Sequence, residues 1–264
     1  MILQRRTKYL QIALNGSLDD AKQVINDLPQ SENILIEAGT PLIKELGTEA
    51  IAEIRSLTKP NAYLVADIKC ADLADREVQI VSESHAIPGS SFIPAATNAS
   101  FFDALKMTAQ QLEAIQNRSR AGIPFGKTAA GASAATVLGV APVETIDLFI
   151  EECRKHKIDS MVDMMNVENP LFVLKKLKTL PDVVILHRGV DETEFSREKQ
   201  IPYYQIKQIK GNFNVLVSVA GGDTIREVQS AFFNDADIVV VWKNFYQANQ
   251  DTARLAADFL KEVK

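Results

Sequence analysis

The chain has 264 residues, of which 46% are hydrophobic and 24% are charged. These proportions are typical of a globular protein. The formal net charge of −5 argues against the basic surface that nucleic-acid binding needs, and no apolar run approaches the roughly 20 residues of a membrane span. Two cysteines, Cys70 and Cys153, exclude a disulfide framework, and the first residues show no signal-peptide pattern. We therefore expect a cytoplasmic protein with no nucleic-acid or membrane partner.

Short apolar segments with strand-like composition recur along the chain, and eight of them qualify as strands. Several are apolar without alternation, as parallel strands buried on both faces are. The predicted strands are Tyr9–Leu14, Ile34–Ala38, Ala62–Ile68, Ala134–Leu138, Ser160–Met164, Val183–His187, Asn214–Val219 and Asp237–Val241.

The segments between these strands carry helix signals. Ser17 is placed to cap a helix with acids in its first turn, Pro142 opens a segment with apolar residues at helical spacing, and the segment from Thr224 repeats that pattern. Eight alternating strand–helix units favour a closed (β/α)8 TIM barrel of the α/β class over an open doubly wound sheet.

One interval departs from this repeat. The chain between the third and fourth strands is roughly 45 residues longer than one unit of about 30 residues requires. No low-complexity linker separates the extra residues, so we interpret 1–264 as a single barrel domain with an insertion at about 83–130. We expect the insertion to lie beside Asp72, at the rim where substrate enters.

In a barrel of this type, functional residues lie at the carboxyl ends of the strands and in the loops that follow. Carboxylates, a lysine and one of only three histidines occupy those positions here. We expect seven of the residues on this rim to bind substrate: Asn15, Asp163, Arg188, Asp191, Gly221, Gly222 and Lys243.

The third strand supplies the most specific group. Alternation places Asp67 and Lys69 on the same, inward side, with Asp72 just beyond in the loop. Two carboxylates that flank one ammonium fix its position and its protonation. Glu37 from the neighbouring strand joins Asp67 to give two hard oxygen ligands suited to Mg²⁺, which could stabilise an enediolate. The alternative is a set of ion pairs that closes the end of the barrel.

His187 ends an apolar strand and faces the lysine and the acids, which favours a general base over a hydrogen-bonded core histidine. Gly221 and Gly222 follow the seventh strand, where backbone amides bind phosphate in many barrels. A tight turn is the alternative explanation for two adjacent glycines.

Several segments together resemble one known family. They are Leu10-Gln-Ile-Ala-Leu-Asn, Ile36-Glu-Ala-Gly-Thr-Pro, Ala66-Asp-Ile-Lys-Cys-Ala-Asp, Val162-Asp-Met-Met-Asn-Val, Leu186-His-Arg-Gly-Val-Asp and Val219-Ala-Gly-Gly. They look like the archaeal type of the 3-hexulose-6-phosphate synthase family, in the orotidine-5′-phosphate decarboxylase group. The Asp-x-Lys-x-x-Asp motif at the end of a third strand is specific for that group, and the resemblance covers nearly the whole chain outside about 83–130.

The resemblance implies a Mg²⁺-dependent aldol reaction that joins formaldehyde to ribulose 5-phosphate, or its reverse. By this analogy Glu37 and Asp67 hold the metal, and Lys69 helps to steady the enediolate. His187 moves the proton. Asp72 enters the active site of the partner subunit, which implies a homodimer with shared active sites and a phosphorylated ketose as substrate.

Other positions keep alternatives open. The related 3-keto-L-gulonate-6-phosphate decarboxylases look similar but carry an arginine at the position of Val190. Asn15 stands where the family has Asp, Ala74 where it has Gly, and Trp242-Lys243 where it has Gly-Arg. Lysine keeps a positive charge but lacks the guanidinium fork. These departures also fit a diverged paralogue that binds a ligand without catalysis or acts on an altered substrate.

Overall fold

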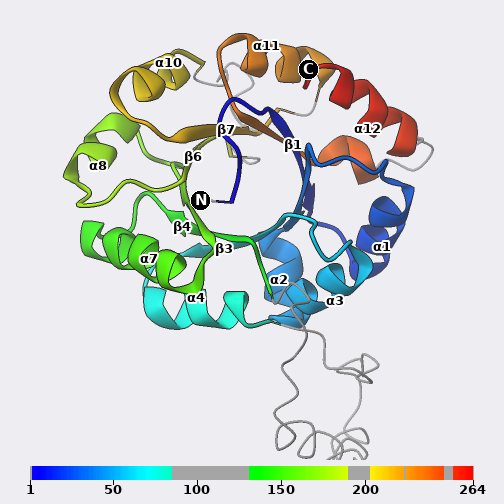
Figure 1. The fold of residues 1–264 in the computed structure, drawn as a ribbon, viewed down its shortest axis with the longest axis horizontal. Helices are drawn as coiled ribbons and strands as arrows, with labels where there is room; N and C mark the ends of the chain where they lie inside the picture. The colour runs from blue at the N-terminus through cyan, green and yellow to red at the C-terminus, as the bar shows by residue number, and fades with distance from the viewer. Residues whose placement is uncertain (1, 85–130, 190–202, 223, 247–251, 264) are drawn as a thin grey trace, which may run out of the picture.

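The computed structural model describes all residues except 1, 85–130, 190–202, 223, 247–251 and 264. Eight parallel strands pair in chain order and the last pairs with the first, so the sheet is a closed barrel surrounded by helices (Figure 1). The predicted (β/α)8 TIM barrel is confirmed. The strands are β1 (Tyr9–Leu14), β2 (Ile34–Ala38), β3 (Leu64–Cys70), β4 (Ala134–Leu138), β5 (Asp159–Asp163), β6 (Val183–His187), β7 (Leu216–Ala220) and β8 (Ile238–Val241).

The helices cover the outside of the barrel. They are α1 (Leu18–Asp27), α2 (Thr40–Leu46), α3 (Glu49–Leu57), α4 (Ala74–Ser82), α7 (Val143–His156), α8 (Pro170–Lys176), α10 (Tyr203–Asn212), α11 (Ile225–Phe233), the short 3-10 helix η1 (Lys243–Tyr246) and α12 (Thr252–Lys261). None of the described helices combines the length and apolar character needed to cross a bilayer.

Local sequence explains where two of these helices begin. Ser17 caps α1 through a reciprocal pair of hydrogen bonds with Asp20, and Thr224 caps α11 in the same way with Glu227. Each pair satisfies backbone N–H groups that the first turn of a helix leaves without a partner. Glu227 is therefore held at the start of α11, next to the end of β7.

The barrel has two apolar layers. Side chains that point outward from the strands, such as Leu10, Ile36 and Val184, pack under the helices, whereas Leu35, Met161 and other inward side chains fill the barrel itself. Every second residue of a strand faces inward, so the same alternation that packs the interior also places polar residues at its carboxyl end.

The amino end of the barrel is closed by the first residues of the chain. The buried carboxylate of Asp159 accepts hydrogen bonds from the backbone N–H groups of Ile2, at 2.6 Å, and Leu3, at 3.1 Å. Tyr63 donates its hydroxyl proton to the same carboxylate at 2.9 Å. The first described residues accordingly lie inside the ring of strands in Figure 1. This packing leaves the carboxyl end as the open end of the barrel.

The insertion joins the barrel at its amino end. Helix α4 carries the chain from the carboxyl end of β3 back to the amino end, and residues 85–130 follow that helix. On the return, Gly131 accepts hydrogen bonds from Arg55, and Ser133 donates its backbone N–H to Leu64 at 2.7 Å. Both attachment points therefore lie at the amino end of the barrel, opposite to the rim that carries Asp72. Residues 85–130 themselves lie outside the described part of the chain.

Candidate active site

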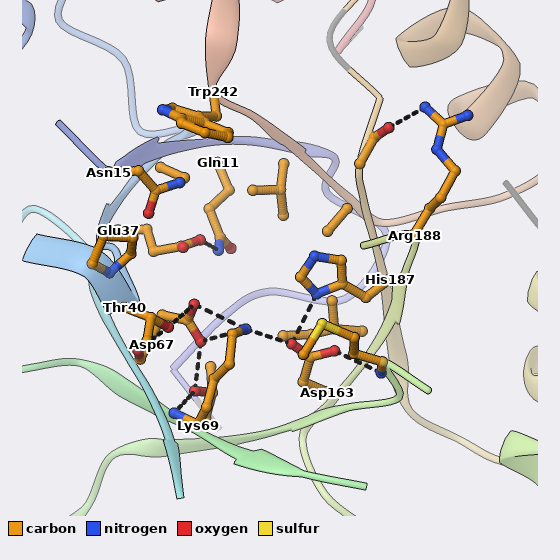
Figure 2. A pocket seen from close by; sticks show the side chains of 18 of the residues that line it. Gln11, Asn15, Glu37, Thr40, Asp67, Lys69, Asp163, His187, Arg188 and Trp242 are labelled. Atoms are coloured by element: carbon orange, nitrogen blue, oxygen red, sulfur yellow. Dashed lines mark hydrogen bonds and ion pairs between the residues drawn. The ribbon is translucent and has the colours of Figure 1, made fainter. Parts of the chain in front are cut away.

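A cavity of about 470 Å³ opens at the carboxyl end of the barrel (Figure 2). Its wall consists of inward side chains of the strands and of residues just after them. The polar and charged residues that line it are Gln11, Asn15, Glu37, Thr40, Asp67, Lys69, Thr136, Asp163, His187, Arg188, Glu227 and Lys243.

The third strand delivers Asp67 and Lys69 to this cavity by an irregular path. Alternation alone predicts that both face inward, and both line the cavity. Lys69, however, has a left-handed backbone with φ 49°, and the pairing of β3 with β4 shifts between Ala66 and Cys70. A β-bulge of this kind re-aims a side chain next to the place where pairing resumes. Cys70 itself points outward into the apolar layer beneath the helices.

Asp163 connects the lysine to the histidine. Its Oδ2 lies 2.8 Å from Nζ of Lys69 and 2.9 Å from Nδ1 of His187, and its Oδ1 accepts the backbone N–H of Met165 at 2.9 Å. Burial by itself raises the pKa of this carboxyl. The hydrogen bond and charge of His187, together with the charge of Lys69, outweigh burial and lower the pKa to about 2. Asp163 is thus a buried anion whose oxygens are already bonded to protein groups. We assign it to positioning Lys69 and His187 rather than to the expected contact with substrate.

The charges of Lys69 and His187 follow from this arrangement. Burial lowers the pKa of Lys69, but Asp67, 3.1 Å away, and Asp163 outweigh it and raise the pKa above its ordinary value. The pKa of His187 is also raised, because the bond to Asp163 outweighs the effect of burial. Lys69 is therefore a fixed cation. His187 is a stronger base than free histidine, and its Nδ1 is bonded to Asp163.

Glu37 and Asp67 form the pair of carboxylates expected to bind a metal. Hydroxyl groups hold both oxygens of Asp67: Thr136 lies 2.8 Å from Oδ1 and Thr40 lies 2.7 Å from Oδ2. Gln11 donates its side-chain N–H to Glu37. Burial, followed by the negative charge of Asp67, raises the pKa of Glu37 to about 7.

The donor chemistry of this pair fits a magnesium ion. Two buried carboxylates in mutual repulsion become more stable with a divalent cation between them, and Mg²⁺ usually takes one or two carboxylates and completes its shell with water and substrate oxygens. Across the described residues, no group of three or more His, Cys, Asp or Glu side chains could form an all-protein metal cage. Any ion here would therefore keep several positions for water and substrate.

The opposite side of the cavity holds Asn15 and Lys243, which were expected to bind substrate, together with Trp242. Asn15, Trp242 and Lys243 line it, and Figure 2 shows Trp242 near the Asn15 side, away from Lys69. The side chain of Asn15 lies directly over Gly39, where a Cβ atom would be only 1.8 Å from its Oδ1. A glycine at that position is therefore a condition for this placement of Asn15.

Arg188 lines the cavity but points toward the turn after β7. Its Nη2 donates to the carbonyl oxygen of Gly221 and lies 3.2 Å from Oε1 of Glu227. Gly221 has φ 97°, and a Cβ atom there would lie 2.3 Å from the backbone oxygen of Arg188. Only glycine fits such a turn. Its neighbour Gly222 is buried and is not part of the cavity wall.

Besides Gly222, two predicted residues are not brought into the cavity by the described part of this chain. Asp72 is exposed beside the rim and does not line the cavity. Asp191 and Val190 lie outside the described residues. Conversely, sequence reasoning missed Gln11, Thr40, Thr136 and Glu227. For Gln11 and Thr136 a signal was present, because each is a polar residue at an inward position of an otherwise apolar strand.

The fold and the site together define a class: a (β/α)8 barrel with a carboxylate-bound lysine at the end of its third strand and a histidine at the end of its sixth. Within that class, residues 8–116 match the model of the orotidine 5'-phosphate decarboxylase / HUMPS family. The match covers less than half of the chain and agrees with the resemblance indicated by the motifs.

Curated relatives extend the similarity over most of the chain. The bifunctional enzyme Fae/Hps of Methanocella arvoryzae is 34% identical over 260 residues, which covers 97% of this chain and 53% of the relative. The enzyme of the same name from Methanoregula boonei is 32% identical over 257 residues, covering 97% and 52%. The chain therefore spans about half the length of the curated relatives it matches.

Solved structures share the fold. The 3-hexulose-6-phosphate synthase from Salmonella typhimurium has a TM-score of 0.70 at 23% identity and covers 97% of this chain and 98% of its own. KGPDC from Streptococcus mutans has a TM-score of 0.66 at 18% identity, with 98% of each chain covered. At these identities the comparison with structures shows the fold alone.

Proposed function

We propose that this protein is a cytoplasmic, Mg²⁺-dependent aldehyde-lyase that joins formaldehyde to ribulose 5-phosphate, or runs the reverse reaction. One observation carries the proposal: Lys69 and His187 are held by the same oxygen of Asp163, beside the carboxylates of Glu37 and Asp67, in one open cavity. The curated relatives, which are named Fae/Hps, support the same activity.

The side chains can perform this reaction in two proton transfers. His187, made more basic by Asp163, takes a proton from C1 of ribulose 5-phosphate and leaves an enediolate. The ammonium of Lys69 stabilises the negative charge that develops on the enediolate oxygens. C1 then forms a bond to the carbon of formaldehyde, and His187 returns its proton to the formaldehyde-derived oxygen. Bound Mg²⁺ would supply a Lewis acid at Glu37 and Asp67.

The test is an assay of formaldehyde consumption by the purified chain with Mg²⁺ and ribulose 5-phosphate, next to a known synthase. We expect consumption, and we expect His187→Gln to lower kcat by about 10²- to 10⁴-fold because it removes the general base. The matched control is His156→Gln on α7, whose ring contacts Ser82 far from the cavity. If the known synthase consumes formaldehyde and this chain does not, the proposed activity is wrong.

We further propose a homodimer in which Asp72 completes the partner's active site, because its exposed position at the rim keeps it out of its own cavity. Two inactive variants, Asp72→Asn and His187→Gln, are then expected to regain activity when they are mixed and allowed to exchange subunits. One intact site per mixed dimer predicts recovery of about a quarter of the wild-type rate. No recovery, despite subunit exchange shown by mass spectrometry, would exclude shared sites.

A second candidate function rests on Trp242, whose indole lines the cavity at the end of β8. Here the chain would be a diverged member that binds a bulkier or non-phosphorylated ligand, with or without catalysis. The triple variant Trp242→Gly, Lys243→Arg and Asn15→Asp is then expected to bind ribulose 5-phosphate at least about tenfold more tightly than the parent. Calorimetry measures both affinities. Equal affinities would count against this candidate.

Release of CO₂ from 3-keto-L-gulonate 6-phosphate would instead indicate a decarboxylase.

A further inference from the structure

We propose that Thr136 is a positioning residue, whose single hydroxyl fixes both the backbone of Lys69 and the carboxylate of Asp67. The geometric part of this proposal holds for the protein with or without ligands. The catalytic consequence rests on the proposed function. Thr136 lies on β4, lines the cavity and is almost completely buried.

The pairing of β3 with β4 shows why this position is special. Ala66 pairs with Ala135, and the next pair is Cys70 with Val137. Between these two pairs β3 advances by four residues while β4 advances by two, so the segment that contains Asp67 and Lys69 bulges around one residue of β4. That residue is Thr136.

The hydroxyl of Thr136 makes a bond to each side of this bulge. It accepts the backbone N–H of Lys69 at 3.0 Å and donates its own proton to Oδ1 of Asp67 at 2.8 Å. A hydroxyl has one proton to donate and lone pairs to accept, so both bonds can exist together. No other side chain in the described hydrogen-bond network contacts both the Lys69 backbone and the Asp67 carboxylate.

The bond to the Lys69 backbone supports an uncommon conformation. Lys69 has φ 49°, in the left-handed region that residues other than glycine occupy rarely. In the normal ladder this N–H would pair with a carbonyl oxygen of β4. The bulge removes that partner, and the hydroxyl replaces it. Without the hydroxyl, a part-buried N–H loses its acceptor and the bulge loses its support.

Loss of the Thr136 hydroxyl affects the reacting groups through the position of Lys69. The bulge aims its ammonium between Asp67, at 3.1 Å, and Asp163, at 2.8 Å. Thr40 holds the second oxygen of Asp67 independently at 2.7 Å, so loss of Thr136 should change the orientation of that carboxylate without releasing it. We therefore expect an effect on the rate of the chemical step rather than on substrate affinity.

The experiment compares three variants of the full chain. Thr136→Val removes the hydroxyl at nearly constant shape, and Thr136→Ser restores it. Ser218→Ala is the matched control, because Ser218 is a buried side chain on β7 whose Oγ has no hydrogen-bond partner within the described residues. The first readout is amide hydrogen exchange at Lys69 in the metal-free protein, measured by NMR. It requires no catalytic activity.

We expect the Lys69 amide to exchange at least about tenfold faster in Thr136→Val and within about threefold of wild type in Thr136→Ser and Ser218→Ala. In the proposed aldol assay, kcat should fall at least about tenfold for Thr136→Val with KM within about threefold, and the serine variant should recover most of the rate.

Two results would overturn the proposal: unchanged protection of Lys69 in Thr136→Val, or faster exchange spread evenly over the strands, which indicates a merely structural role. Activity that stays normal in Thr136→Val while Lys69 loses its protection would refute the catalytic part. If the exchange pattern is as expected but wild type consumes no formaldehyde, the proposed function fails and the positioning role of Thr136 stands.

Discussion

The variant Lys69→Met is expected to lose about 3–5 kcal/mol of unfolding free energy at pH 7, together with all measurable catalysis. Removal of one partner from a buried ion pair leaves the other charge without compensation, and such losses fall in this range. Here Nζ of Lys69 is bonded to two carboxylates, of which Asp163 has a side chain only 1% exposed. Methionine fills a similar volume, so packing changes little and the charge accounts for the effect.

A double-mutant cycle tests this explanation. If the uncompensated anion is the cause, Lys69→Met combined with Asp163→Asn should be more stable than Lys69→Met alone, although each single change is destabilising. Urea denaturation at pH 7 measures all four proteins. Lys155→Met is the control, because Lys155 pairs with Glu151 and Glu152 on the exposed face of α7 and its loss should leave stability unchanged. If the double variant were less stable than Lys69→Met, loss of packing rather than charge would be the explanation.

The bonds of Asp163 to Lys69 and His187 also make the unfolding free energy depend on pH in acid. The pKa of Asp163 is about 2 in the folded protein, below the ordinary 3.8. A carboxyl group with a lowered pKa stabilises the fold above its unfolded-state pKa, and this contribution disappears as the pH falls toward the folded value. Asp163 therefore contributes fully above pH 4 and loses its contribution between about pH 4 and pH 2.

Most strands could be predicted from the sequence because the local signal and the tertiary environment agree. Four of the eight predicted ranges, those of β1, β2, β4 and β6, match the structure residue for residue. The third was predicted to end at Ile68, but β3 continues to Cys70. Its last residues pass through the bulge at Lys69, and the contact with Thr136 that supports the bulge comes from another strand. Local propensity carries no information about such a contact.

The charged residues of the site could be predicted because strand ends in a barrel converge on one rim. The bonds that Asp163 makes within the protein could not. The position of Asp163 at a strand end predicts a substrate ligand. Only the folded geometry shows that Lys69 and His187 are both bonded to its carboxylate. The insertion was expected beside Asp72, whereas its attachment points lie at the amino end because α4 precedes it. That helix returns the chain to the amino end before the extra residues begin.

Glu37→Gln is expected to change stability in the opposite direction from Lys69→Met. The pKa of Glu37 is raised from 4.5 to about 7, first by burial and then by the charge of Asp67. A carboxyl group with a raised pKa favours the folded state when protonated, so stability falls as the pH rises from about 4.5 to 7. Above pH 7 the full cost of the buried charge is about 3 kcal/mol. Glutamine removes this charge and keeps the shape, so the metal-free variant should be more stable than wild type at pH 8 by about this amount.

If Glu37 is a metal ligand, Mg²⁺ should reverse the order of stability of wild type and Glu37→Gln. A bound cation offsets the repulsion between Glu37 and Asp67, so wild type gains stability as Mg²⁺ is added, by an amount that grows with the ratio of free Mg²⁺ to Kd. Glu37→Gln loses one anionic oxygen donor and should gain little. Thermal unfolding at pH 5 and pH 8, with and without Mg²⁺, measures both effects, and Glu45→Gln on the exposed face of α2 is the control.

The four conditions separate the two explanations for these carboxylates. A pure ion-pair closure of the barrel predicts that Glu37→Gln responds to pH as expected and that Mg²⁺ has no effect on either protein. A metal site predicts the same pH response in the metal-free proteins together with Mg²⁺ stabilisation confined to wild type. A Glu37→Gln variant that is less stable than wild type at pH 8 without metal would contradict both, because a buried carboxylate beside Asp67 must then have a stabilising partner other than a cation.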